Sequence, residues 1–92
     1  MIKSWRHKGL KQFFETGSTA GIQPKHASKL KLLLGVLNAA ICPKDMNLPG
    51  FKLHPLKGDK KGYYSVWVNG NWRATFIFEG ANATVVNYED YH

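Results

Sequence analysis

The sequence has one cysteine, two arginines and six acidic residues in a chain of 92. Because Cys42 stands alone, no internal disulfide can form and a cysteine-based metal framework is excluded. HExxH, P-loop and GxGxxG motifs are also missing, so we expect neither a metal nor a cofactor. The longest apolar run, residues 32–42, is interrupted by Gly35 and Asn38 and is too short to span a bilayer.

The first eight residues contain no apolar stretch of the kind that forms the core of a signal peptide. Since a bilayer-spanning run is missing as well, we expect a cytoplasmic protein with no membrane partner.

Lysine is what the sequence has in excess, and it brings the net charge to +7 and the pI to about 9.7. So large a charge on a small chain favours an anionic partner: nucleic acid, an acidic protein or an anionic membrane surface. Composition leaves open a basic surface that only keeps the protein soluble. Arg73 stands out among the cations, because a guanidinium group offers a planar fork that binds phosphate through two parallel hydrogen bonds.

Hydrophobic periodicity predicts two helices in the first half of the chain. The first is expected over residues 8–16, with Gly17 suited to its C-terminal cap. The second is expected over residues 25–41, after Pro24 and before Cys42-Pro43. The apolar face of the second helix consists of Leu30, Leu33, Leu34, Leu37 and Ile41, and Lys25, His26, Lys29 and Lys31 lie largely off that face.

The second half of the chain alternates between apolar and polar residues as strands do. Strands are predicted over residues 63–68, 72–78 and 84–88, with tight turns at 69–71 and 79–82. Shorter strands are expected over 2–5 and 51–56, with Phe51 and Leu53 buried and Pro55 at a sheet edge. Residues 1–92 should therefore form one α+β domain, in which two N-terminal helices pack on one face of a small, mainly antiparallel sheet.

Candidate functional residues fall at the open side of this sheet. Arg73 is predicted on the face opposite Phe76 and Phe78, where it would hold a phosphate or pair with Glu89 or Asp90. His54 would transfer protons near neutral pH, or else be a half-buried histidine at a strand end.

The last three residues, Asp90, Tyr91 and His92, are all ionisable. We expect this triplet to meet His54 and Arg73 in one shallow basin lined with cations. Such a basin has acid/base groups, cations and a phenol, but no Ser or Cys nucleophile. Cleavage of RNA by its own 2′-hydroxyl needs only these groups, and DNA, which lacks that hydroxyl, would not be cut.

Three motifs carry a resemblance to a known family: residues 52–58 (KLHPLKG), residues 71–73 (NWR) and residues 86–92 (VNYEDYH). They resemble the HigB toxins of bacterial toxin–antitoxin modules in both order and spacing. The opening residues 1–4 and the FFETG segment at 13–17 fit the same pattern, so the resemblance covers essentially the whole chain. It implies the fold of the RelE-like superfamily, with helices against a curved sheet.

The resemblance also implies a metal-independent endoribonuclease that cuts translated mRNA in the ribosomal A site and so inhibits translation. The implied partners are the 70S ribosome with its mRNA and a HigA-type antitoxin, through which alone the toxin would reach operator DNA. The implied catalytic residues are His54, Lys57, Arg73, Asp90, Tyr91 and His92. The lysines implied in binding ribosomal RNA are Lys25, Lys29, Lys31, Lys60 and Lys61.

The resemblance also implies roles within the catalytic set. Lys57 and Arg73 are interpreted as phosphate-binding groups. The proton-transfer groups are His54, Asp90 and His92, with base and acid not distinguished, and Tyr91 would stack on a base or donate a hydrogen bond. Two other functions stay open: an RNA-binding module without catalysis, and a toxin of this fold with a target other than the ribosome.

Overall fold

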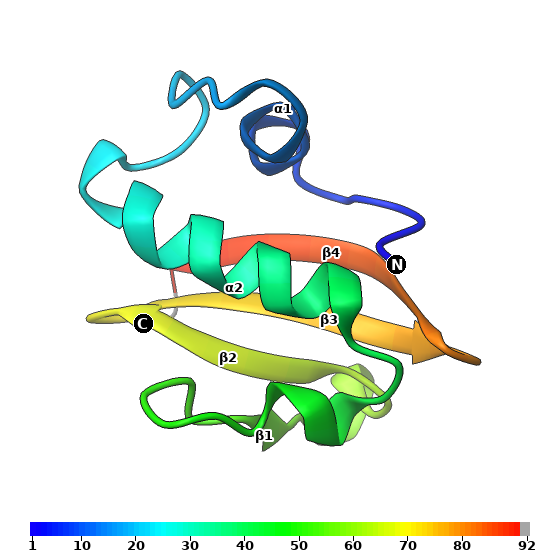
Figure 1. Ribbon diagram of the computed structural model, residues 1–92. Coiled ribbons are helices and arrows are strands. Elements are labelled where there is room, and N and C mark those ends of the chain that lie inside the picture. The colour runs from blue at the N-terminus through cyan, green and yellow to red at the C-terminus, as the bar shows by residue number, and fades with distance from the viewer. Residues whose placement is uncertain (91–92) are drawn as a thin grey trace.

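The computed structural model describes residues 1–90, whose helices and strands form two layers. Figure 1 shows α2 crossing one face of a sheet, with α1 beside it on the side of β4. The sheet has the order β1-β2-β3-β4, and each neighbouring pair is antiparallel. The predicted α+β class is therefore confirmed. The elements are α1 (Lys8–Thr16), η1 (Pro24–His26), α2 (Ala27–Ala39), η2 (Pro43–Met46), β1 (His54–Pro55), η3 (Gly58–Lys60), β2 (Tyr64–Asn69), β3 (Trp72–Glu79) and β4 (Asn82–Asp90), where η marks a 3₁₀ turn.

Helix α1 has the limits that its sequence predicts. The Nδ1 atom of His7 accepts a hydrogen bond from the backbone N–H of Leu10, which caps the first turn. Gly17 ends the helix with a φ of +81°, a left-handed conformation that glycine adopts at no steric cost.

Helix α2 is shorter than predicted at both ends. Pro24 opens the separate turn η1, and the helix ends at Ala39 because Ala40 turns to an extended conformation with a ψ of 146°. Ile41, predicted on the apolar face, is 65% exposed as a result. The other four apolar positions, Leu30, Leu33, Leu34 and Leu37, are fully buried as predicted.

The two predicted turns close hairpins, and glycine is needed in each. Gly70 and Gly80 have φ values of +55° and +62°, which suit the twist of tight hairpin turns. Strand β4 carries a bulge, where pairing with β3 shifts between Thr75 and Ile77 and Val85 takes a φ of +53°.

The two shorter predicted strands form only in part. Residues 2–5 make isolated parallel bridges, Ile2 with Ala83 and Trp5 with Val86. In the segment 51–56 only His54–Pro55 pairs with β2, at the sheet edge where proline is tolerated. Phe51 is buried as predicted, whereas Leu53 is half-buried.

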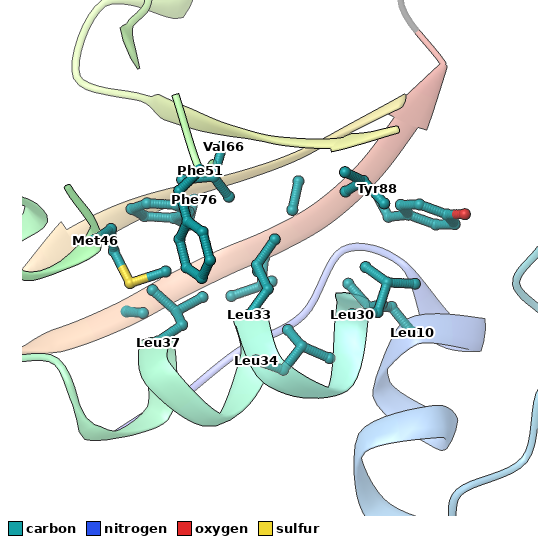
Figure 2. Packing of buried hydrophobic residues seen from close by; sticks show 14 of the residues in the cluster. Leu10, Leu30, Leu33, Leu34, Leu37, Met46, Phe51, Val66, Phe76 and Tyr88 are labelled. Carbon is teal, nitrogen blue, oxygen red and sulfur yellow. The ribbon is translucent and has the colours of Figure 1, made fainter. Parts of the chain in front are cut away.

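The hydrophobic core lies between the helices and one face of the sheet (Figure 2). Val66, Phe76 and Val86 contribute to it from the three long strands, and Met46 and Phe51 close one end. His26, which the sequence places largely off the apolar face of the second helix, is nevertheless buried, at 1% exposure. It belongs to η1 and not to a regular helix, and its imidazole turns inward to the hydroxyl of Tyr88.

Candidate active site

The face of the sheet away from the helices, here called the outer face, carries the polar residues of interest. Strand pairing sets them in two rows that cross the strands. One row is His54, Ser65, Thr75 and Asn87, and the other is Trp67, Arg73 and Glu89. Neighbouring rows stand roughly 7 Å apart along the strands, so long side chains of the two rows reach a common space.

A hollow of about 610 Å³ lies at these rows. Its lining consists of Lys52, Leu53, His54, Leu56, Ser65 and Arg73. Ser65 is only 1% exposed and forms the floor, whereas His54 is exposed. The fold therefore brings an imidazole and a guanidinium group to one open hollow, as expected for two of the predicted catalytic residues.

Arg73 is half-buried and pairs across the sheet with Trp67 on β2 and Glu89 on β4. Glu89, which the sequence analysis named as an alternative partner of Arg73, is therefore its cross-strand neighbour. Asp90 ends the described part of β4 and pairs with Trp72, so the strand register puts it beside that residue rather than beside Arg73. Tyr91 and His92, the other two members of the predicted triplet, lie outside the described residues.

Lys57, the sixth predicted catalytic residue, precedes η3 and directly follows Leu56 of the hollow. Its side chain is exposed. Lys60 and Lys61 follow in the same loop, and the ammonium group of Lys60 lies 5.2 Å from the ring centroid of Tyr63. The loop therefore adds positive charge near the hollow.

The other three lysines predicted to bind RNA belong to the helix layer. Lys25 and Lys31 are exposed, and Lys31 lines a smaller hollow with Phe13, Phe14 and Gly17. Lys29 is engaged within the protein: its Nζ donates to the carbonyl of Gly50 at 3.1 Å and lies 4.9 Å from the ring centroid of Phe51.

Two histidines and a tyrosine on the helix side of the sheet have shifted pKa values. Burial lowers the pKa of His26, and the charge of Lys25 lowers it further. Burial also lowers the pKa of His7, against a smaller opposing effect from a backbone hydrogen bond. The pKa of Tyr88 is raised, chiefly by burial. Tyr88 stacks on Trp72 and so connects this group to the strand that carries Arg73.

Sequence reasoning did not select Lys52, Ser65 or Trp67. The alternation of residues 63–68 does place Ser65 and Trp67 on the outer face, so their position was available from the pattern. Lys52 carries no such signal, because its place in the hollow depends on a φ of +50°.

Among residues 1–90, no group of three or more histidine, cysteine, aspartate or glutamate side chains is arranged to hold a metal ion. Within the same residues, every helix is too short or too polar to cross a membrane.

Solved structures share this fold. One is a histidine-to-glutamine mutant of YafQ from E. coli, with a TM-score of 0.58 and 19% identity, covering 97% of this chain and 94% of that one. Another is a copper-bound mutant toxin from Helicobacter pylori, with a TM-score of 0.55 and 17% identity, covering 98% of this chain and 94% of that one. These likenesses show that the two-helix, four-strand architecture is a shared fold.

Sequence comparison identifies the family to which the chain belongs. The family model described as "RelE-like toxin of type II toxin-antitoxin system HigB" matches residues 3–92. The chain therefore belongs to the HigB-like toxin family, which confirms the resemblance carried by its three motifs. It is 46% identical to Endoribonuclease HigB of Proteus vulgaris over 92 residues, which is the full length of both chains. As one half of a type II toxin–antitoxin pair, the chain has an antitoxin as its partner.

Proposed function

We propose that this chain is an endoribonuclease that cuts mRNA on the translating ribosome without a metal ion. The observation that carries the proposal is the hollow where His54 and Arg73 meet on the outer face. The name of the Proteus vulgaris relative supports the reaction class, since the identity extends over both whole chains. On this proposal, residues 1–92 act as one toxin domain in the cytoplasm, where ribosomes are.

The reaction needs a nucleophile only from the substrate. A protein base takes the proton of a ribose 2′-hydroxyl, and the oxygen attacks the adjacent phosphorus atom. The bond to the 5′-oxygen then breaks, leaving a 2′,3′-cyclic phosphate, and an acid protonates the departing oxygen. His54 is placed to exchange one of these protons, because its imidazole lies exposed at the hollow.

Charge builds on the phosphate as the bond to the 2′-oxygen forms, and cations facing the hollow stabilise it. Arg73 suits this role, because its guanidinium group can bind two phosphate oxygens at once. Lys57 would add a second cation from the neighbouring loop. Asp90, Tyr91 and His92 are proposed to complete the proton-transfer and stacking groups.

Ribosome binding is proposed to rest on the lysines outside the hollow. Lys60 and Lys61 extend the cationic surface beside Lys57, and Lys25 and Lys31 offer charge from the helix layer, whereas Lys29 is already bonded to Gly50. Contacts of lysine with phosphate release counterions, so binding should weaken steeply as salt is raised. The proposed antitoxin is of the HigA type, and operator DNA would be reached only through it.

The test is cleavage of a defined mRNA by the purified chain, with and without programmed ribosomes. We expect cuts only with ribosomes, products that end in a 2′,3′-cyclic phosphate, and no cut in an mRNA with a single 2′-deoxyribose at the cut site. Cleavage at the deoxyribose would contradict attack by the 2′-hydroxyl, and products ending in a 3′-hydroxyl, as a metal-activated water leaves them, would contradict a metal-free mechanism. Ribosome binding without cuts would favour an RNA-binding module, and neither binding nor cuts would favour another target.

A further inference from the structure

Trp67 is fixed on the outer face directly beside Arg73. The two residues pair across β2 and β3, and therefore point to the same side of the sheet. The indole Nε1–H donates to the carbonyl of Gly70 at 2.9 Å, which holds the ring in one orientation. A half-buried, oriented aromatic ring thus stands next to the guanidinium group of the hollow.

Lys52 places its ammonium group over this ring. Its Nζ lies 4.5 Å from the ring centroid of Trp67, within the range in which a cation is attracted to an aromatic face. The side chain is exposed and lines the hollow together with His54 and Arg73. In residues 1–90 the ring is the only partner that the ammonium group has.

The backbone of Lys52 is held in an unfavourable conformation. Its φ is +50°, a region in which glycine would be free of the steric cost that a side chain brings. The chain is anchored before and after Lys52: the carbonyl of Phe51 accepts from the N–H of Trp67 at 2.7 Å, and His54, two residues further on, pairs with Ser65. Strain that anchored neighbours maintain is characteristic of functional sites, and here it directs a lysine into the hollow.

Lys29 also approaches the ring of Trp67, with its Nζ 5.4 Å from the ring centroid, but it differs from Lys52 in its other contacts. That group is already bonded to the carbonyl of Gly50, so it contributes to holding the segment 50–51 in place. Lys52 has no such structural bond among the described residues. Its charge is therefore available to an anion in the hollow.

We propose that Lys52 is a phosphate-binding residue for single-stranded RNA, and that Trp67 is the residue that positions it. Lys52 and Arg73 would hold successive phosphates of the strand that enters the hollow, in the combination of cations and an aromatic ring that single-strand-binding surfaces use. This inference rests on the proposed function and extends its RNA contacts beyond the residues predicted from sequence.

The experiment measures binding of a fluorescein-labelled 2′-O-methyl RNA of about ten nucleotides, a length that small single-strand-binding folds cover. This RNA cannot be cleaved by its own sugar hydroxyl, so binding is read without turnover. Fluorescence anisotropy is recorded over a range of salt concentrations, and the slope of log Kobs against log salt counts phosphate contacts. The variants are Lys52→Gln, Lys52→Arg, Trp67→Leu and Trp67→Phe, with Lys8→Gln on α1 as the matched loss of one charge.

Losing one phosphate contact should reduce the magnitude of the slope by about 0.7. We expect that reduction for Lys52→Gln and Trp67→Leu, and near wild-type slopes for Lys52→Arg, Trp67→Phe and Lys8→Gln. Equal slopes for Lys52→Gln and Lys8→Gln, or no binding by the wild type, would overturn the site. An unchanged slope for Trp67→Leu would overturn the positioning role. Because Lys52 is exposed, its variants test the site even if a Trp67 variant fails to fold.

The outcome separates this site from the proposed function. A wild-type chain that binds the methylated RNA through Lys52 but never cuts unmodified mRNA would sink the proposed function alone. Normal ribosome-dependent cleavage, with no change in slope for Lys52→Gln, would sink this site alone.

Discussion

The Nδ1 atom of His26 shares a hydrogen bond with the hydroxyl of Tyr88, across 62 positions of the sequence. The bond connects η1 to Tyr88 near the end of β4, two residues before Asp90. Figure 2 shows the hydroxyl of Tyr88 directed away from the packed leucines, at one end of the core. The Nε2 atom of His26 is buried and has no hydrogen-bond partner among residues 1–90, so this imidazole is poorly prepared to carry a charge.

This setting predicts acid-sensitive stability. Because the pKa of His26 is lowered in the fold, the unfolded chain binds the proton more readily. The stabilising contribution is fully present above the ordinary histidine pKa of about 6.5 and is lost as the pH falls below it. His7, whose pKa is also lowered, acts in the same direction.

Urea unfolding between pH 7.5 and pH 5 is the measurement, and the free energy of unfolding should fall with pH. In His26→Gln the fall should be smaller, although this variant is less stable at every pH because Tyr88 loses its partner. A His26→Gln chain with an undiminished pH dependence would refute this role of His26.

Lys29 gives a second prediction, in which one lysine stabilises the fold and its neighbour on the helix does not. Lys29→Met keeps an unbranched apolar side chain but loses the bond to Gly50 and the contacts with Phe51 and Trp67. We expect a loss of about 1 kcal/mol in the free energy of unfolding. Lys31→Met removes the same charge from an exposed position and should change it by less than about 0.5 kcal/mol. Equal denaturation midpoints for the two variants would contradict this.

A pair of glycines provides a third prediction. A Cβ atom on Gly9 would lie 2.5 Å from the carbonyl oxygen of Gly21, so α1 can approach this loop only without a side chain. Gly9→Ala should therefore destabilise the protein by roughly 1–3 kcal/mol. Gly35 on α2 has open space around it, and Gly35→Ala should stabilise by up to about 1 kcal/mol. Thermal unfolding of both variants checks the contrast, and a stable Gly9→Ala chain would show that the approach is not tight.

Patterns within a single element were readable from the sequence. The leucine spacing of α2 and the alternation of β2 and β3 correctly predicted the core face, and with it the outer-face position of Arg73. Gly17 marked the end of α1 for the same local reason. The position of His54 was predicted less directly, because only two residues of its segment pair with the sheet.

Features that depend on contacts between distant elements could not be predicted in this way. His26 lies among lysines in the sequence, and nothing local indicates that its partner is a tyrosine on the last strand. The left-handed conformation of Lys52 likewise depends on the anchoring of Phe51 to Trp67, which no periodicity shows. The roles of both residues therefore depend on the tertiary structure and not on local sequence.

The most direct test of the central claim is the single-turnover rate of mRNA cleavage on programmed ribosomes by His54→Gln and Arg73→Gln, compared with Lys8→Gln. If the hollow on the outer face is the reaction centre, the first two variants should bind ribosomes and cut at least about 100-fold more slowly. Lys8→Gln should cut at the wild-type rate. Folded His54→Gln and Arg73→Gln chains that cleave at the wild-type rate would contradict the account.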